Sequence, residues 1–348
     1  MKIGTFNLVQ KRDPQASAAG TFQQLLHEVR LAEAVGMDMV WIAEHHFSSY
    51  GLSVSPLMTA AWLAGKTTNI RFAPGVLVLP LYDPLRLIQE YSMLSLMTDG
   101  RIDFGIGTGY QGYEFERYRV PIAEAGDRTI EIMDLFHQAI ETGKVAYRGK
   151  YYDIPETGIA VHAHSKTPAI FAAAALRHPT FPRMAARRGY IPMLSPGWSP
   201  FQQVVDQRAF YDSIAREEGV DPKSLPMTVM RFVHVTDSKQ DALAAAEAFR
   251  YSTRAAAAFR FNYAQFDRNA PMDLPAKDEP TLDDIVRNTI IGDAQTCIEK
   301  IVAEARALRA SHYACMMSVG GLDAAKVTGS IEKMGNAVIP AVRKAMAA

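Results

Sequence analysis

The sequence predicts a single (β/α)₈ TIM barrel of the α/β class, and three observations carry this prediction. Strand-like and helix-like segments alternate eight times along the chain without a break in composition. Hydrophobic residues make up 48% of the 348 residues, which is enough for one large core. A bare barrel needs about 250 residues, which leaves roughly 100 for insertions. We therefore predict one domain, residues 1–348, with insertions at 144–166 after the fourth strand and at 262–285 between the seventh and eighth strands.

The first half of the barrel follows from short apolar segments bounded by turn residues. Its strands are predicted at 3–9, 39–43, 70–79 and 101–106. Its helices are predicted at 22–35, 56–65 and 84–97, where apolar residues recur near helical spacing. Gly36 marks the end of the first helix, and Pro84 begins the third.

The second half repeats the alternation with more insertions. Strands are predicted at 169–173, 190–194, 227–235 and 312–319, and a small hairpin at 147–154. Helices are predicted at 127–140, 183–188, 201–218, 240–259, 294–308 and 323–334. The segment 262–285 is rich in Pro, Asp and Asn and lies between the last two strands, so we expect a lid over the barrel mouth.

Composition excludes several classes of function. Lys and Arg number 37, as do Asp and Glu, which argues against binding nucleic acid or an anionic membrane through bulk charge. Cys297 and Cys315 lie far from any C-x-x-C spacing and suggest neither disulfides nor zinc. The N-terminus enters a strand without a signal-peptide core, and no apolar run could span a bilayer. We expect a soluble, cytoplasmic protein.

The most informative motif is Glu44-His45-His46, which follows the buried strand 39–43 directly. Polar residues at the carboxyl end of a barrel strand usually serve chemistry, because the strand itself is packed on all sides. Histidine also exchanges a proton near neutral pH. We interpret this run as catalytic; the alternative is a pair of loop histidines that only cap the strand.

A glycine-rich run, 105–112, contains a G-x-G-x-x-G match after the fourth predicted strand. A Rossmann dinucleotide site would need a helix next, but 113–121 is aromatic and ends at Pro121. We favour a strand end where a flat ligand or a phosphate comes close to bare backbone.

Two further motifs allow more than one interpretation. His162-Ala163-His164 copies a metal-binding H-x-H pair, but it lies in a polar insertion without further ligands, so we predict a solvated loop and no metal. Pro74-Gly75 interrupts the third strand, either because a flat ligand presses on the barrel mouth or because the strand bends to fit the barrel taper.

Taken together, these segments resemble the bacterial luciferase-like flavin-dependent monooxygenases, and the luciferase alpha subunit most. The resemblance rests on 41–47, 76–80 and 99–107, extends through 194–195 and 292–297, and covers nearly the whole chain. It implies reduced FMN supplied as a co-substrate by a separate flavin reductase. Oxygen then adds to give a flavin-4a-hydroperoxide, which oxygenates a small organic substrate. It also implies a homodimer.

The resemblance assigns roles to the Glu-His-His run. His45 matches the catalytic histidine of the family and would act as an acid or base on the oxygen adduct. Glu44 would orient the ring of His45 or raise its basicity. Phe6, Leu8, Met58, Tyr110 and Trp198 are expected to face the pocket, which suggests an apolar or aromatic substrate.

The resemblance also places the cofactor. The family has a non-prolyl cis peptide in the third strand, which falls at Gly75-Val76; Pro74 departs from the luciferase pattern and would allow Ala73-Pro74 instead. Gly107, Thr108 and Tyr110 are expected to line the cofactor site after the fourth strand.

The phosphate end of the cofactor departs from the luciferase pattern, because Thr108 stands where the luciferase has an arginine. After the fifth strand, Ala174 is expected at the site, and Arg177 or His178 would supply the missing charge.

Two alternatives stay open. One is a relative that uses a reduced deazaflavin as hydride donor. The other is a flavin-binding barrel without catalysis, against which the Glu44-His45 pair counts, because a pure binder needs no positioned acid or base.

Overall fold

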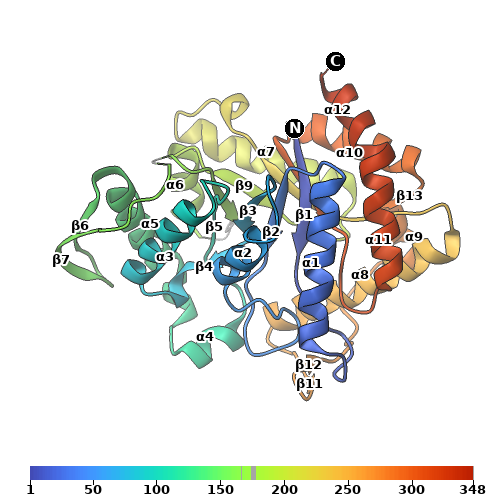
Figure 1. The fold of residues 1–348 in the computed structure, drawn as a ribbon, viewed down its shortest axis with the longest axis horizontal. Coiled ribbons are helices and arrows are strands. Elements are labelled where there is room, and N and C mark those ends of the chain that lie inside the picture. Colours follow the sequence, from blue (N-terminus) through green and yellow to red (C-terminus); the bar gives the residue numbers. More distant parts are fainter. Residues whose placement is uncertain (166, 174–177, 348) are drawn as a thin grey trace.

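A computed structural model describes residues 1–165, 167–173 and 178–347 of the chain (Figure 1). Within these residues, the barrel sheet runs in the order β3-β2-β1-β14-β10-β9-β8-β5-β4. Its members are β1 (Lys2–Asn7), β2 (Met39–Ile42), β3 (Arg71–Pro74), β4 (Leu77–Val78), β5 (Phe104–Gly107), β8 (Ile170–Ala173), β9 (Ile191–Leu194), β10 (Thr228–Val235) and β14 (His312–Met316).

The barrel closes because β3 and β4 are the two halves of one strand. β3 pairs in parallel with β2, and β4 pairs in parallel with β5. A further bridge joins Phe72 of β3 to Ile102. Eight parallel strands therefore form the barrel within the described residues, and the predicted (β/α)₈ fold is confirmed.

Helices surround the barrel on its outer face (Figure 1). The helices of the described residues are α1 (Ala18–Ala34), α2 (Pro56–Ala64), α3 (Pro84–Met97), α4 (Gly112–Tyr118), α5 (Ala125–Thr142), α6 (Phe181–Arg187), α7 (Phe201–Glu217), α8 (Lys239–Arg260), α9 (Leu282–Asn288), α10 (Ala294–Leu308), α11 (Ala324–Lys333) and α12 (Ile339–Ala347). Among them, α4 lies at the carboxyl end of β2 and not on the outer face. Short 3₁₀ turns lie at Leu79–Leu81, Ile122–Glu124 and Pro222–Ser224, and a π-turn at Met334–Val338 joins α11 to α12.

Polar N-caps fix where several of these helices begin. The side chains of Ser17, Ser55 and Asp83 each accept a hydrogen bond from a backbone amide in the first turn of α1, α2 and α3. Ser238 and Asp293 do the same for α8 and α10. Each cap satisfies an amide that has no partner inside its own helix.

The core has two layers because side chains alternate along each strand. One set fills the barrel interior and includes Phe6, Trp41, Phe171, Met230 and Met316. The other set packs between the strands and the surrounding helices. No helix in the described part of the chain combines the length and the apolar character needed to cross a membrane.

Two interior glycines allow neighbouring strands to approach. A Cβ on Gly4 would lie 2.0 Å from the carbonyl oxygen of Met39, and a Cβ on Gly105 would lie 1.8 Å from that of Pro74. Both obstacles are backbone atoms, so neither can move aside without displacing a strand. Glycine is therefore required here by the barrel itself.

The two predicted insertions contain more structure than the sequence suggested. In the first, β6 (Lys144–Arg148) and β7 (Asp153–Gly158) form a longer hairpin than the one expected at 147–154. In the second, β11 (Phe266–Asp267) and β12 (Ala270–Pro271) form a small hairpin.

Three elements correct the sequence analysis. The helix α4 occupies part of the segment expected to be non-helical, and it is held by contacts of Glu114 and Phe115, which are both buried. The helix α9 begins at a capping box on Thr281, inside the segment taken as a lid. The strand β13 (Ile290–Gly292) then pairs with β10.

Candidate active site

The carboxyl end of β2 opens into a buried polar cluster. Glu44, His45 and His46 are exposed by only 2%, 8% and 5%. Successive side chains of an extended segment point in opposite directions, so Glu44 and His46 face one side and His45 the other. The two histidines consequently have different partners.

His45 is held through one ring nitrogen and free at the other. Its Nδ1 lies 3.2 Å from Glu114 Oε1 and 2.9 Å from Gln111 Nε2. Its Nε2 makes no hydrogen bond to any described residue. The ring lies against Tyr50, with 4.7 Å between centroids, and a Cβ at Gly51 would come within 2.9 Å of it. The protein thus orients His45 and leaves Nε2 without a partner among the described residues.

The expected partnership of Glu44 with His45 is wrong. Glu44 Oε1 instead accepts a hydrogen bond from His46 Nε2 at 2.9 Å. Its Oε2 accepts from the Tyr82 hydroxyl at 2.7 Å and from the Val78 amide at 3.1 Å. On the other side of His46, the Tyr118 hydroxyl donates to Nδ1 at 3.0 Å. Glu44 and His46 therefore tie β2 to β4 and α4.

Glu114 is the carboxylate that serves His45, and the sequence analysis missed it. It is exposed by 1%, and its Oε1 also accepts the backbone N–H of His46 at 2.8 Å. Gln111, Glu114 and Tyr118 all contact the histidine pair. Their spacing of three and four residues puts them on one face of α4, and this spacing was the available signal.

Aromatic side chains line the space beside His45. The Tyr110 hydroxyl lies 3.4 Å from that of Tyr50, and Gln111 Nε2 donates to Tyr110 at 3.3 Å. Burial raises the pKa of both phenols, so both stay protonated at neutral pH. Phe6, Leu8 and Trp198 belong to the same cluster as Tyr110 and fit the expected apolar pocket. Met58 does not, because it is 73% exposed on α2.

The predicted glycines lie at the mouth, where they accommodate the protein's own side chains. The Gly75-Val76 peptide is cis, which decides between the two positions considered. A Cβ on Gly75 would lie 2.8 Å from the Phe6 ring, and one on Gly107 would lie 2.4 Å from the Val76 side chain. Thr108 Oγ1 lies 3.5 Å from the carbonyl oxygen of Gly109 and is partly exposed. Contact of Gly75, Val76, Gly107 and Thr108 with a cofactor stays a prediction.

The phosphate end is only partly described. Ala174 and Arg177 lie outside the described residues. His178 uses both ring nitrogens within the protein. Its Nδ1 accepts from the Thr180 and Phe181 amides at 3.3 and 3.0 Å, and its Nε2 lies 3.6 Å from Asp127. To bind a phosphate it would have to give up one of these contacts.

The mouth suits a flat, mostly apolar cofactor. Val76, Tyr110 and Trp198 are partly exposed there above the apolar barrel interior. Beside them, the buried Oε1 of Gln111 has no partner among the described residues, and neither does His45 Nε2. A ring system with one polar edge would satisfy both atoms, so the residues present fit an isoalloxazine.

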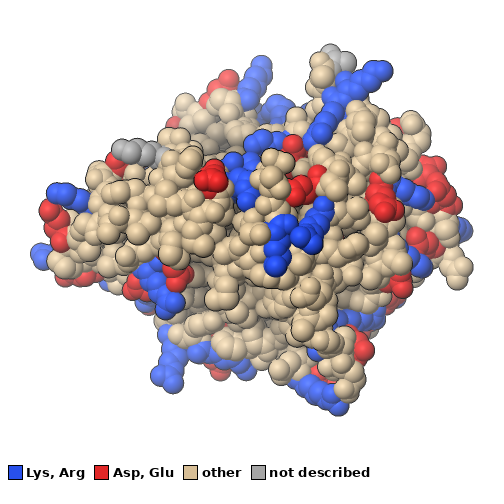
Figure 2. Space-filling view, viewed as in Figure 1, with Lys and Arg blue, Asp and Glu red and all other residues tan. Residues whose placement is uncertain are grey.

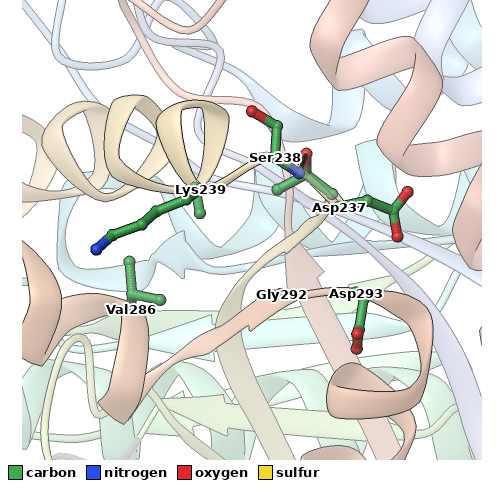
Figure 3. Close-up of a pocket in the computed structure, with 8 residues that line it drawn as sticks. Asp237, Ser238, Lys239, Val286, Gly292 and Asp293 are labelled. Atoms are coloured by element: carbon green, nitrogen blue, oxygen red, sulfur yellow. Dashed lines mark hydrogen bonds between the residues drawn. The ribbon is translucent and has the colours of Figure 1, made fainter.

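Two hollows lie elsewhere. One, of about 280 Å³, is bordered by Thr236–Lys239, Val286 and Asp293; Figure 3 shows Lys239 reaching alongside Val286 while Asp237 and Asp293 lie opposite. The other, of about 220 Å³, lies beside His162. His162 and His164 are exposed, as predicted. The described residues contain no cluster of three or more side chains able to hold a metal.

The fold and this cluster define a barrel enzyme with a positioned histidine at its mouth. The model of the luciferase-like monooxygenase family matches residues 1–312, so the chain belongs to that family and is an oxidoreductase. The oxygenase component of a flavin-dependent trigonelline monooxygenase from Acinetobacter baylyi is 25% identical over 98% of this chain and 95% of its own. The alkanal monooxygenase alpha chain of the Kryptophanaron alfredi symbiont is 25% identical over 65% of this chain and 62% of its own.

Solved structures confirm the fold. A monooxygenase from Streptomyces bottropensis has a TM-score of 0.83 at 22% identity, over 98% of this chain and 99% of its own. The oxygenating constituent of 3,6-diketocamphane monooxygenase from Pseudomonas putida, solved with FMN, has a TM-score of 0.77 at 21% identity, over 98% of each chain. An F420-dependent secondary alcohol dehydrogenase has a TM-score of 0.73 at 18% identity, over 98% of this chain and 99% of its own.

Proposed function

We propose that the protein is the oxygenase component of a two-component monooxygenase that uses reduced FMN and oxygen on a small organic substrate. The observation that carries this proposal is His45, which is fixed through Nδ1 and free at Nε2 beside an apolar mouth. A non-catalytic flavin binder would have no use for such a residue.

The chain's own residues contribute orientation, proton transfer and shielding. Reduced FMN, when bound, supplies the electrons that activate oxygen. Glu114 and Gln111 hold the His45 ring, and Nε2 then delivers or accepts the proton that accompanies oxygen transfer. Tyr50, Tyr110 and the apolar barrel interior keep water away from the reacting atoms.

The choice of FMN over a deazaflavin is supported by the relatives, two of which are named as flavin- or FMN-linked oxygenases. The FMN-bound structure and the F420-dependent dehydrogenase, at 21% and 18% identity, are both similar in fold alone, so the relative named as flavin-dependent carries the choice. Titrating the protein with reduced FMN, oxidised FMN and a reduced deazaflavin tests the choice. Tight binding of reduced FMN supports the proposal, whereas preference for the deazaflavin and indifference to oxygen would overturn it.

The role of His45 has a direct test. His45→Ala should fold and bind reduced FMN like the wild type, yet oxygenate roughly 10²–10⁴-fold more slowly, because a positioned acid or base contributes about that much. His162→Ala, an exposed histidine at the outer hollow, is the matched control. Equal rates in both variants would remove His45 from the mechanism.

A separate reductase in the cytoplasm would supply the reduced flavin, a proposal supported by the oxygenase-component name of one relative.

We also propose a homodimer that buries the outer face of α2 and α3. Met58, Met93, Leu96 and Met97 are exposed by 73%, 50%, 48% and 67% on these two helices. Figure 2 shows few charged side chains over this part of the surface. Exposed apolar patches of this kind typically mark association surfaces.

A further inference from the structure

An exposed cation with no acidic partner among the described residues lies beside the His45 cluster. Arg260, the last residue of α8, places its guanidinium carbon 4.9 Å from the centroid of the Tyr110 ring. It forms no ion pair with a carboxylate of any described residue. Arg254, six residues earlier on the same helix, is paired with both Asp273 and Glu279.

A single aromatic ring separates Arg260 from His45. The Tyr110 ring that carries Arg260 on its face lies 6.0 Å from the His45 ring between centroids. The Tyr110 hydroxyl is bonded to Gln111, whose amide nitrogen also reaches His45 Nδ1. The positive charge is close enough to lower the pKa of both Tyr110 and Tyr50, against the stronger effect of their burial.

Aromatic side chains pack against one another near the end of α8. Tyr113 contacts Phe259 and Phe266, with centroid distances of 5.8 and 5.0 Å, and Tyr50 contacts Phe259 at 5.4 Å. Phe259 immediately precedes Arg260 on α8. Phe259 is 1% exposed, and the Arg117 guanidinium carbon covers one face of Tyr113, 3.4 Å from the ring centroid. The partly exposed parts of Tyr113 and Phe266 therefore form the wall against which a planar ring can lie while a charged substituent reaches the guanidinium of Arg260.

The favourable field at the carboxyl end of α8 explains why a basic residue is tolerated in its last turn. It does not explain the placement over Tyr110, where an exposed guanidinium with no acidic partner among the described residues can meet an anion that enters the site. A guanidinium offers two parallel N–H groups, which match a carboxylate.

We propose that Arg260 binds the carboxylate of the substrate, and that the substrate is therefore a planar aromatic acid whose ring lies against the Tyr113–Phe266 wall. This inference rests on the proposed function, because it concerns the molecule that the same site oxygenates. Arg260 is a specificity-determining residue in this arrangement, and His45 remains the acid–base group.

Equilibrium binding without flavin tests the proposal independently of turnover. Three aromatic acids, benzoate, nicotinate and 2-naphthoate, are titrated against their uncharged amides by calorimetry. We expect the wild type to prefer at least one acid to its amide. Arg260→Gln should bind that acid roughly 10- to 100-fold more weakly, the usual effect of losing a charge-assisted pair, and the amide unchanged.

Two control variants sharpen the result. Arg260→Lys should restore part of the preference for the acid, since it keeps the charge and loses the paired N–H groups. Arg216→Gln, on α7, should change nothing. No preference for any acid in the wild type, or an equal loss for acid and amide in Arg260→Gln, would overturn the proposal.

The flavin phosphate is the other anion that could reach Arg260. Titration with reduced FMN and reduced riboflavin separates the two sources. If Arg260→Gln weakens FMN but not riboflavin and leaves the acids unaffected, Arg260 serves the phosphate and the substrate inference is wrong. Failure of the wild type to bind either flavin, with the preference for acids intact, would instead count against the monooxygenase proposal alone.

Discussion

At the scale of single residues, the site depends on which carboxylate serves which histidine. Glu114 contacts His45, and Glu44 contacts His46. In the first pair, His45 Nε2 has no partner among the described residues, whereas the second pair is surrounded by Tyr82, Tyr118 and the Val78 amide. His45 therefore keeps a free ring nitrogen for the proposed proton transfer, and His46 holds β2, β4 and α4 together.

Glu114→Gln should separate orientation from binding. Glutamine keeps an oxygen for the His46 amide but removes the charge beside the His45 ring. We expect kcat to fall roughly 10- to 100-fold, the range for a hydrogen bond to a charged group, while the KM for reduced flavin stays constant. Steady-state kinetics measure both.

Glu116→Gln is the control for this change, since Glu116 lies on the same helix with its side chain 80% exposed. If Glu114→Gln raised KM and left kcat unchanged, Glu114 would be a binding residue and its positioning role would be wrong.

The sequence predicts the position of His45 but not its carboxylate partner. His45 could be predicted because its signal is local: polar residues directly follow a buried strand. Its carboxylate could not, because Glu114 lies 69 residues further along the chain and Glu44 is adjacent. Glu44 cannot be the partner of His45, because adjacent side chains on an extended segment point in opposite directions.

The neighbours of the two site glycines could not be predicted from the sequence either. Gly75 and Gly107 could be recognised as unusual inside strands, but their nearest obstacles are the Phe6 ring and the Val76 side chain. A valine at either position would first disturb the packing of the barrel. These substitutions are therefore poor tests of flavin contact.

At the scale of elements, the segment between α8 and α9 is anchored at its middle. Arg254, whose side chain is 11% exposed, pairs with Asp273 Oδ1 at 2.9 Å and donates from Nε to Glu279 Oε2 at 2.7 Å. The Ser49 amide donates to the Asn269 carbonyl oxygen at 2.7 Å. These contacts hold the segment against the loop that follows His46.

Arg254→Met should loosen this segment and open the mouth to water. We expect reduced-flavin affinity to stay within about twofold, and a larger share of the oxygen to leave as hydrogen peroxide, because lids shield reactive species from solvent. The measurement is the peroxide yield per flavin oxidised. Arg287→Met, whose side chain is 70% exposed on α9, is the control. An unchanged peroxide yield would show that the segment does not shield the site and is only a tolerated insertion.

The elements that the sequence analysis missed are those that depend on distant partners. The helix α4 has only seven residues, too few for a periodic signal, and its buried face is defined by β2. The strand β13 has three residues and is stabilised by β10. The longer helices α3, α7, α8 and α10 could be predicted because each carries its own apolar stripe and end signals.

At the scale of the whole molecule, a buried histidine links stability to pH. Burial, together with Lys2 and the N-terminal amine, lowers the pKa of His312 from 6.5 to about 4. The ring lies inside the barrel against Trp41 and Phe171. Because the unfolded chain binds this proton more tightly, stability is full above the ordinary pKa and falls as the pH drops toward 4.

His312→Asn should flatten this dependence. Between about pH 7.5 and about pH 5, His312 alone accounts for a loss of about 2 kcal/mol in the free energy of unfolding. Urea titrations at both pH values should show a difference smaller by that amount in His312→Asn. The exposed His162→Asn should behave like the wild type. The same loss in all three proteins would show that other groups dominate.

The proposed dimer is the second property of the whole molecule. Met97→Glu and Met58→Glu each place a charge on the apolar face of α2 and α3, and both should yield monomers by light scattering. Met272→Glu, at a residue 44% exposed in the segment between α8 and α9, should leave the mass unchanged. A wild type that is monomeric at all concentrations would contradict the proposal.

The close approach of strands at Gly4 and Gly105 also affects how mutational data on this protein should be interpreted. In a library of all single substitutions scored by survival of activity, both positions should reject every residue, alanine included, because each Cβ would meet a carbonyl oxygen. In such a library, the loss of activity at Gly4 and Gly105 would look like the loss expected at His45. Soluble yield separates the two cases: variants of the glycines would be lost during folding, whereas variants of His45 would accumulate as inactive protein.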